Sequence, residues 1–457
     1  MQLPRIMIGA PSSGSGKTMI TCGILQAFVN RGLKVASFKC GPDYIDPLFH
    51  KEVIGTKSKN LDTFFSDEDT IKYLFGKTAK DADISVMEGV MGFYDGVGGI
   101  STTGSSYELA RMTDTPSILV INCKGMSLSL IPLIQGFLQY QENCNIIGVI
   151  LNQMSKSLYS IIKDQIEREL GIKVFGYVPF VKELVISSRH LGLVMPEEIN
   201  DFHSKLNKLA DILEETIELD EILRMAGKSD ELYYEIPKIP KLSQEIRIAV
   251  AKDEAFCFYY QDNLELLQDM GAKLIEFSPL HDKKLPKDTN GILFGGGYPE
   301  LVADKLSSNE SMRASIRTAL NQKMPCLAEC GGFMYLHTQM EDISGQSYPM
   351  VGSIAGEVYK TDKLNRFGYI TLKANQNQMV ATYGESIAAH EFHYFDSNAC
   401  GESFTAFKPL RKTQWNCIHG NENMAVGFPH LYYYSNMSFS FRFLNTCLDW
   451  KMKNENR

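Results

Sequence analysis

A glycine-rich loop between a short apolar segment and a helical pattern is the feature that most constrains the fold. Arg5–Gly9 is apolar enough to be a buried strand, and Ala10–Thr18 (APSSGSGKT) follows it and leads into the helical pattern of Thr18–Arg31. A strand, a glycine-rich loop and a helix in this order are the setting of a phosphate-binding loop in an α/β domain. The sequence therefore predicts a nucleotide-binding α/β domain at its start.

The residue types in this loop suit contact with phosphate oxygens. Gly14 and Gly16 leave the backbone free to close its N–H groups around the oxygens. Lys17 adds a positive charge, and the Thr18 hydroxyl is a suitable ligand for Mg²⁺. A chance glycine–serine turn is the alternative, but strand, loop, Lys-Thr pair and helix all agree. We expect ATP to contact the loop and one lysine after the next strand: Ser13, Gly14, Ser15, Gly16, Lys17, Thr18 and Lys39.

Short apolar segments alternate with helical patterns along the first domain, as in a mostly parallel sheet covered on both faces. The expected strands are Arg5–Gly9, Lys34–Lys39, Ile84–Glu88, Ser117–Ile121, Ile146–Leu151 and Lys173–Val178. A polar-rich helical stretch and a proline-containing linker follow. A second alternation then has strands at Arg247–Ala251, Lys273–Phe277 and Gly291–Phe294 and a helix at Asn263–Met270. We predict an ATP-binding domain at 1–190, a helical segment and linker at 191–244, and a second α/β domain at 245–457.

Composition limits the partners of the chain. Its 457 residues are 44% hydrophobic and 22% charged, which is ordinary for a globular protein with two domains. The net charge of −8 argues against a nucleic-acid partner, because a phosphate backbone needs a basic surface. No apolar run reaches the ~20 residues that cross a bilayer, so no membrane partner is expected. Ten cysteines without metal-type spacing or an export signal indicate reduced thiols in the cytoplasm, and a homodimer is compatible with the sequence.

Two acidic clusters follow expected strands and should lie near the phosphate-binding loop, because ligands gather at the carboxyl ends of parallel strands. Lys39–Pro47 carries Asp43 and Asp46, and Glu88 ends the third expected strand. With the Thr18 hydroxyl, these three carboxylates are our candidate Mg²⁺ ligands, since Mg²⁺ prefers oxygen donors. For each aspartate alone, a role in a turn or a helix cap fits the sequence equally well.

A cysteine stands at a sharp turn in the second half of the chain. Met324–Leu336 (MPCLAECGGFMYL) is typical of a strand, a tight turn and a helix, with Cys330 at the turn and small residues beside it. This is the pattern of a nucleophile elbow, and the start of a helix favours a thiolate. We therefore expect Cys330 to be a thiolate nucleophile. The alternative, a buried structural cysteine, fits Cys326 better.

An acyl-cysteine mechanism also needs oxyanion donors and a base. Gly295–Glu300 (GGGYPE) follows an expected strand, so we expect the N–H groups of Gly296 and Gly331 to serve as donors. The base must be a histidine, and spacing alone does not choose among the strongest candidates: His390, His393 and His430.

The chain resembles the cobyrinate a,c-diamide synthase family of tetrapyrrole-amidating enzymes over nearly its whole length. The segments that carry the likeness are Ala10–Thr18, Lys39–Pro47, Glu88–Gly96, Arg247–Gln261 (RIAVAKDEAFCFYYQ), Gly295–Glu300, Ala328–Gly332 and His390–Tyr394. The resemblance implies a dethiobiotin synthetase-like P-loop domain followed by a class I glutamine amidotransferase-like α/β domain. It also implies that Cys330 hydrolyses glutamine with His430 as its partner. Tyr432 stands where the family has a second histidine, and other class I amidotransferases have a glutamate two residues after the histidine, so the third member of the site is unassigned.

The resemblance further implies the reaction. ATP would phosphorylate the a- and c-acetate carboxylates of cobyrinate, and ammonia from glutamine would displace phosphate from each acyl phosphate. Tyr44 and Ile45 would help to orient the macrocycle, with ordinary loop packing as the alternative. Because ammonia must stay unprotonated, we expect it to travel along a shielded path. The polycarboxylate should also need cations from the second domain, and the candidates are Lys360, Lys363 and Arg366. For each of them, an ordinary charged loop in solvent is the simpler interpretation.

Two other functions fit the same sequence. The first is the same chemistry on hydrogenobyrinate or nickel-sirohydrochlorin. The second is a P-loop switch protein, like the partition ATPases, that carries a non-catalytic amidotransferase-like domain as a binding module. The fitting context of Cys330 argues against the second, and glutamine hydrolysis by the wild type and by Cys330→Ser would discriminate the two.

Overall fold

The computed structural model describes residues 2–181, 196–364 and 366–455. The chain divides into two compact units, Met1–Pro237 and Lys238–Arg457. None of the helices in the described ranges combines the length and the hydropathy of a transmembrane segment.

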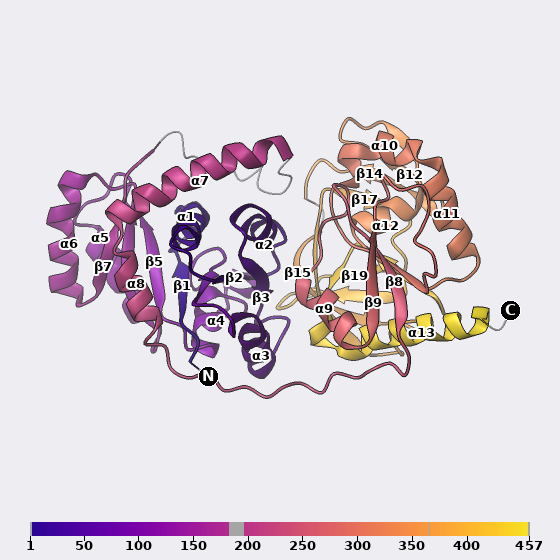
Figure 1. The fold of residues 1–457 in the computed structure, drawn as a ribbon, viewed down its shortest axis with the longest axis horizontal. Helices are drawn as coiled ribbons and strands as arrows, with labels where there is room; N and C mark the ends of the chain where they lie inside the picture. Colours follow the sequence, from indigo (N-terminus) through magenta and orange to yellow (C-terminus); the bar gives the residue numbers. More distant parts are fainter. Residues whose placement is uncertain (1, 182–195, 365, 456–457) are drawn as a thin grey trace. The chain divides into compact units, whose positions relative to one another are not determined.

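The first unit is built on a seven-stranded sheet in which each neighbouring pair is parallel, in the order β3-β2-β4-β1-β5-β6-β7. Its strands are β1 (Arg5–Gly9), β2 (Val35–Cys40), β3 (Lys57–Leu61), β4 (Ile84–Glu88), β5 (Ser117–Asn122), β6 (Ile146–Asn152) and β7 (Lys173–Val178). They are short and mostly buried, as expected for a parallel sheet that helices cover (Figure 1).

Helices connect these strands and cover the sheet. They are α1 (Lys17–Asn30), α2 (Ile45–Phe49) with a π-helical turn (His50–Ile54), α3 (Glu68–Ala79), a 3-10 turn (Val97–Gly99), α4 (Ser106–Met112), α5 (Leu130–Tyr140), α6 (Lys156–Leu170), α7 (Pro196–Thr216) and α8 (Leu219–Ala226). Helix α7 lies along α1 (Figure 1), and its Leu209 and Leu213 share one apolar core with Ile20 and Ile24 of α1. The helical stretch that precedes the linker therefore packs on the first unit.

The strand order brings distant parts of the sequence to one edge of the first sheet. Strand β4 lies between β1 and β2, and Glu88 pairs with Ile8 on one side and with Lys39 on the other. Because these strands are parallel, the loop before α1, the segment after β2 and the end of β4 meet at their carboxyl ends.

The second unit holds a six-stranded sheet in the order β20-β21-β11-β10-β8-β9, parallel except for the pair β20–β21. Its strands are β8 (Ile246–Ala251), β9 (Ala272–Phe277), β10 (Gly291–Phe294), β11 (Cys326–Glu329), β20 (His419–Gly420) and β21 (Met424–Gly427). The helices of this unit are α9 (Gln261–Asp269), a 3-10 turn (Pro299–Val302), α10 (Ala303–Ser308), α11 (Glu310–Asn321), α12 (Gly331–Leu336), a second 3-10 turn (Tyr433–Ser435) and α13 (Met437–Glu455).

Two smaller sheets complete the second unit. The first has the order β13-β12-β14-β17, and the second has the order β19-β18-β15-β16-β22. Their strands are β12 (His337–Glu341), β13 (Ser347–Pro349), β14 (Ile354–Lys360), β15 (Arg366–Ala374), β16 (Ser386–His393), β17 (Phe395–Ser397), β18 (Phe404–Phe407), β19 (Gln414–Cys417) and β22 (His430–Leu431). The β16–β22 pair places His390 opposite His430.

The sequence predicted most strands of the two large sheets but missed β3. Arg5–Gly9, Ile84–Glu88, Lys173–Val178 and Gly291–Phe294 are strands with the predicted bounds. Strand β3 has the polar sequence KSKNL, although neighbouring parts of the fold bury most of it. Glu88 consequently ends the fourth strand of the chain, which corrects its predicted place at the end of the third.

Candidate functional site

The phosphate-binding loop joins β1 to α1 and contains two glycines in left-handed backbone conformations. Gly14 has a φ of 78° and Gly16 has a φ of 91°. A Cβ on Gly16 would stand 2.2 Å from Nδ2 of Asn152, which donates a hydrogen bond to the Ser15 carbonyl at 2.8 Å. Ser13 and Gly14 are exposed at the tip of the loop, whereas Ser15 is buried. Both the backbone conformation and the available space therefore require glycine at position 16.

Lys17 is the first residue of α1, and its side chain is largely buried. Its ammonium group donates a hydrogen bond to the carbonyl of Met91 at 3.1 Å. Burial and the nearby charge of Lys39 lower the pKa of Lys17. A buried ammonium is costly when its hydrogen-bond partner is a neutral carbonyl, so a bound anion would stabilise it. This position therefore suits a phosphate group.

Four predicted residues form one buried cluster at the end of β4. Thr18 Oγ1 donates a hydrogen bond to Glu88 Oε1 at 2.5 Å. Lys39 Nζ lies 2.8 Å from the same oxygen and 2.5 Å from Asp46 Oδ2. Burial alone would lower the pKa of Lys39, but Glu88 and Asp46 hold that pKa well above its usual range. Burial opposes ionisation of Asp46, but Lys39 lowers the pKa of this carboxyl.

Asp43 takes the turn role that the sequence left open. Its Oδ1 accepts the backbone N–H of Ile45 at 2.8 Å, and its carbonyl accepts a hydrogen bond from Asn60 Nδ2 at 2.6 Å. Burial, and then the charge of Asp46, raise the pKa of Asp43 to about 6. Tyr44 is buried and Ile45 is half-buried in the same turn, and their contact with a macrocycle stays a prediction.

The donor set fits a magnesium ion that also binds nucleotide phosphates. Glu88 Oε2 is buried without a hydrogen-bond donor among the described residues, and His50 Nε2 lies 3.5 Å from it. Burial lowers the pKa of His50. In the described ranges, no group of three or more carboxylate, histidine or cysteine side chains could hold a metal ion. Asp43, Asp46 and Glu88 therefore do not form a self-contained metal site, and Mg²⁺ commonly takes one or two carboxylates plus phosphate oxygens.

The chain turns sharply between β11 and α12 at Cys330. The backbone angles of this residue, φ 45° and ψ −105°, are strained for a residue with a side chain. Its N–H donates a hydrogen bond to the Gly427 carbonyl at 2.8 Å. A Cβ on Gly332 would stand 2.4 Å from Cβ of Phe294, so space requires a glycine there. The turn has the geometry of the predicted elbow.

The Cys330 thiol is only 7% exposed, and its environment disfavours the thiolate. Burial, followed by the carboxylates of Glu300 and Glu391, raises the pKa of this thiol, while the N–H of Gly331 acts in the opposite direction. The predicted thiolate is therefore wrong for this conformation. The reason is that a helix of six residues does not outweigh burial and the charges of three carboxylates, of which Glu329 has the smallest effect. A base must take the proton when the sulfur reacts.

The loop Gly295–Glu300 after β10, called the glycine loop below, lies against the elbow. Phe258 and Gly296 exchange two backbone hydrogen bonds, of 3.1 and 3.3 Å. The N–H of Gly296 is thus already engaged, which argues against its predicted role as an oxyanion donor. The nitrogen of Gly297 lies 3.2 Å from the point where a Cβ on Gly331 would stand. The N–H groups of Gly297 and Gly331 are therefore the better placed pair.

His430 is the candidate base that the structure brings to the glycine loop. A Cβ on Gly296 would stand 2.5 Å from its Cε1 and 3.4 Å from its Nε2. On the other edge of the ring, Nδ1 lies 3.5 Å from Glu329 Oε2. Strand β22 closely follows β21, whose Gly427 accepts the Cys330 N–H. The imidazole consequently lies beside the elbow.

The other two candidate bases have surroundings typical of core histidines. Burial, and then the neighbouring His430, lower the pKa of His390 to about 3. His393 stacks on Phe428 with ring centroids 4.1 Å apart, and its Nδ1 lies 2.5 Å from the Phe395 carbonyl oxygen. Burial lowers the pKa of His393 to about 4. Both rings are therefore neutral and packed against neighbours other than the glycine loop.

Two side chains that the sequence did not single out form hydrogen bonds with the backbone of the second site. The Tyr259 hydroxyl accepts the N–H of Gly295 at 2.8 Å. Asn263 Nδ2 donates to the Leu431 carbonyl at 2.7 Å, and its Oδ1 accepts the N–H of Tyr433 at 2.9 Å. Both lie in or beside the segment 247–261, which the family resemblance singled out without giving its residues a role.

The three candidate cations of the second domain have different surroundings. Lys360 Nζ donates to the Ile343 carbonyl at 2.7 Å, and Lys363 is exposed. The Arg366 guanidinium lies over the Trp415 ring, 5.4 Å from its centroid. Their contact with a polycarboxylate substrate stays a prediction.

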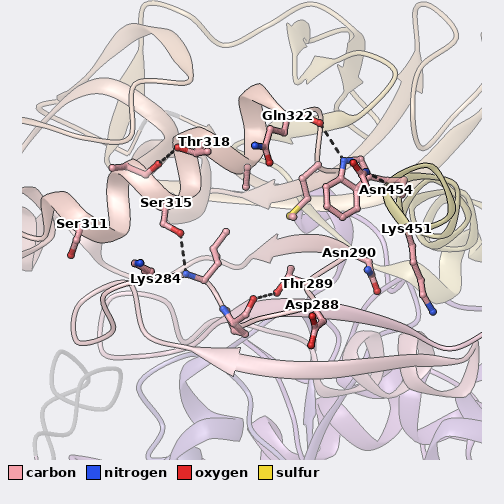
Figure 2. Close-up of a pocket in the computed structure, with 16 residues that line it drawn as sticks. Lys284, Asp288, Thr289, Asn290, Ser311, Ser315, Thr318, Gln322, Lys451 and Asn454 are labelled. Atoms are coloured by element: carbon pink, nitrogen blue, oxygen red, sulfur yellow. Dashed lines mark hydrogen bonds between the residues drawn. The ribbon is translucent and has the colours of Figure 1, made fainter. Parts of the chain in front are cut away.

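A cavity of about 800 Å³ lies at the other end of the second unit's sheet (Figure 2). Asn290, which directly precedes β10, and Met324, which lies just before β11, line it together with Trp450 of α13. These are the amino ends of the strands whose carboxyl ends lead to the glycine loop and to Cys330. The cavity is therefore separate from the cysteine site.

A P-loop unit followed by a unit with a cysteine elbow and an adjacent imidazole defines a nucleotide-binding ligase with a glutamine amidotransferase domain. Residues 6–193 match the CobQ/CobB/MinD/ParA nucleotide binding domain, and residues 247–426 match the CobB/CobQ-like glutamine amidotransferase domain. These matches confirm the predicted fold class.

The chain is also similar over nearly its full length to curated proteins named cobyrinate a,c-diamide synthase. It is 40% identical over 453 residues to the protein of Caldanaerobacter subterraneus subsp. tengcongensis, and the aligned region covers 98% of this chain and 99% of the relative. It is 40% identical over 442 residues to the protein of Clostridium acetobutylicum, which covers 95% of this chain and 98% of the relative. The chain belongs to the cobyrinate a,c-diamide synthase family.

Proposed function

We propose that this chain catalyses the ATP-dependent amidation of the a- and c-acetate carboxylates of cobyrinate, with ammonia released from glutamine. The observation that carries the proposal is the similarity to cobyrinate a,c-diamide synthases, at 40% identity over 98% of the chain. The two sites supply the two chemistries that such a reaction needs. We place the reaction in the cytoplasm, because all ten cysteines are free thiols.

The first unit would activate the carboxylate. A carboxylate is a poor acyl donor, and phosphorylation gives it a leaving group. A carboxylate oxygen attacks the γ-phosphorus of ATP, and ADP leaves with the electrons of the broken bond. The loop N–H groups and Lys17 bind the phosphates, and Lys39 offsets charge on the transferred group. Bound Mg²⁺ would offset further charge on the phosphate oxygens, and Thr18 and Glu88 are the residues that would hold it, with Asp46 and Asp43 nearby.

The second unit would release ammonia. Cys330 Sγ attacks the amide carbon of glutamine while His430 takes the thiol proton. The N–H groups of Gly297 and Gly331 stabilise the oxyanion. The imidazolium returns the proton to the leaving nitrogen, ammonia departs, and water hydrolyses the thioester to glutamate. Ammonia then attacks the acyl phosphate carbon, phosphate leaves, and one proton is lost from the new amide.

The proposal is tested by incubating the protein with ATP, Mg²⁺, glutamine and one of three tetrapyrrole polyacids: cobyrinate, hydrogenobyrinate or nickel-sirohydrochlorin. We expect two amides on cobyrinate, counted by mass spectrometry, and no glutamine-dependent product with Cys330→Ser. Preferred amidation of either other macrocycle would refute the assigned substrate. Equal glutamine hydrolysis by the wild type and Cys330→Ser would refute the cysteine mechanism.

A further inference from the structure

We propose that Glu329 is the positioning residue of His430, so that the carboxylate of the site comes from the residue directly before the nucleophile. The inference rests on the proposed glutamine-hydrolysing function of Cys330. No carboxylate stands two positions after His430, where the chain has Tyr432. A carboxylate partner for this imidazole therefore has to come from elsewhere in the fold.

The two oxygens of Glu329 contact two parts of the histidine segment. Glu329 is the last residue of β11 and is 7% exposed. Its Oε1 accepts the backbone N–H of Leu431 at 3.3 Å, and its Oε2 lies 3.5 Å from His430 Nδ1. The second distance exceeds that of an ordinary hydrogen bond, but catalytic contacts are often long in free enzymes and shorten when substrate binds. The first contact orients the carboxylate toward the ring.

The two nitrogens of the His430 ring face different groups. Nδ1 faces Glu329, whereas Nε2 lies 3.4 Å from the point where a Cβ on Gly296 would stand. A carboxylate at Nδ1 keeps the proton on that nitrogen, so that the lone pair that accepts the thiol proton is on Nε2. It also stabilises the imidazolium that forms in the reaction. This help matters here because burial keeps Cys330 a thiol in the free enzyme.

The backbone around this pair is fixed from both sides. Glu329 pairs with Gly427 in the β11–β21 register, so the carboxylate and the start of the histidine segment belong to adjacent strands. Asn263 bonds the backbone of Leu431 and of Tyr433, on the far side of the histidine. His390, opposite His430 on β16, is neutral because burial lowers its pKa to about 3, so it cannot replace a carboxylate.

The competing explanation is that Glu329 only caps the N–H of Leu431. Glu329→Gln separates the two roles, because an amide oxygen still accepts that N–H but carries no charge toward His430. Glu329→Asp keeps the charge on a shorter side chain. Glu422→Gln, at an exposed position between β20 and β21, is the matched control.

We would measure kcat and KM for glutamine hydrolysis by the full chain. Replacing the triad carboxylate by an amide in a serine protease lowers kcat by about 10⁴-fold, so we expect Glu329→Gln to lower kcat by about 10²–10⁴-fold with little change in KM. Glu329→Asp should recover part of this loss, and Glu422→Gln should match the wild type. ¹⁵N NMR of the histidine should show the Nδ1–H tautomer in the wild type and a mixture in Glu329→Gln. Wild-type kcat with an unchanged tautomer in Glu329→Gln would overturn the inference.

A double-mutant cycle tests whether Glu329 acts through the histidine. We would measure the rate at which iodoacetamide alkylates Cys330, both with His430 intact and in the His430→Ala background. Glu329→Gln should lower this rate when the histidine is present. In the His430→Ala background it should not lower the rate, because the Glu329 charge itself helps to raise the pKa of the Cys330 thiol. An equal loss of rate in both backgrounds would indicate a structural role only. Full glutamine hydrolysis by Cys330→Ser would instead refute the proposed function itself. An inactive Cys330→Ser with a fully active Glu329→Gln would refute the positioning role alone.

Discussion

Gly296→Ala should disable glutamine hydrolysis by displacing the His430 ring. A Cβ at position 296 would stand 2.5 Å from Cε1 of His430, whereas carbon atoms pack at about 3.5 Å. The ring must therefore move by about 1 Å. A displacement of this size costs about 10²-fold in rate, equivalent to about 2.7 kcal/mol of transition-state stabilisation. Gly296 lies outside the left-handed backbone region, so the methyl group itself is the perturbation.

The assay is steady-state glutamate release, with kcat/KM as the measured quantity. Gly136→Ala is the matched control, because its Cβ would meet nothing within 4 Å on α5 and alanine favours a helix by about 0.5–1 kcal/mol. We expect normal glutamine hydrolysis and an unchanged or slightly higher Tm in that variant. Gly296→Ala with kcat/KM within twofold of the wild type would refute the placement of the imidazole against the glycine loop.

Three further predictions concern charge and protonation. Lys17→Ala should abolish amide formation while glutamine hydrolysis continues, because the lysine belongs to the phosphate-binding loop of the first unit and not to the cysteine site. Retained amidation would exclude the P-loop from the reaction. Asp43→Asn should raise the urea midpoint at pH 7.5, because the raised pKa of about 6 means that the folded state disfavours the charged carboxylate. The difference in urea midpoint between Asp43→Asn and the wild type should grow between about pH 4 and pH 6. It should vanish below pH 4, where Asp43 is protonated in both the folded and the unfolded wild type, and a difference that does not depend on pH would contradict the assignment. Alkylation of Cys330 by iodoacetamide, measured against Cys330→Ser, should be slow at pH 7 and rise up to pH 10, and a flat profile would contradict the raised pKa of the thiol.

Local patterns predicted the P-loop and the elbow, because both depend on residues adjacent in sequence. A strand, two glycines and a Lys-Thr pair identify the loop, and small residues around Cys330 identify the turn. The meeting of Thr18 with Glu88 also follows from a general rule, since parallel strands expose their carboxyl ends at one edge. Strand β3 was missed because KSKNL has a polar sequence and is buried only by its neighbours.

The arrangement around His430 could not be predicted, because it depends on pairings between distant segments. Glu329 meets His430 only because β11 pairs with β21, and His390 faces His430 only because β16 pairs with β22. The thiol was expected to ionise easily from its place at the start of a helix. Its burial, which reverses that expectation, is a property of the packed unit and leaves no local trace in the sequence.

The central claim is that nitrogen released at Cys330 enters the product at the expense of ATP. The most direct measurement supplies [amide-¹⁵N]glutamine, ATP, Mg²⁺ and cobyrinate, and counts ¹⁵N in the product together with ADP and glutamate formed. We expect two ¹⁵N atoms per diamide, with one ADP and one glutamate for each amide. Amide formation without ADP, or equal ¹⁵N incorporation by Cys330→Ser, would contradict the claim.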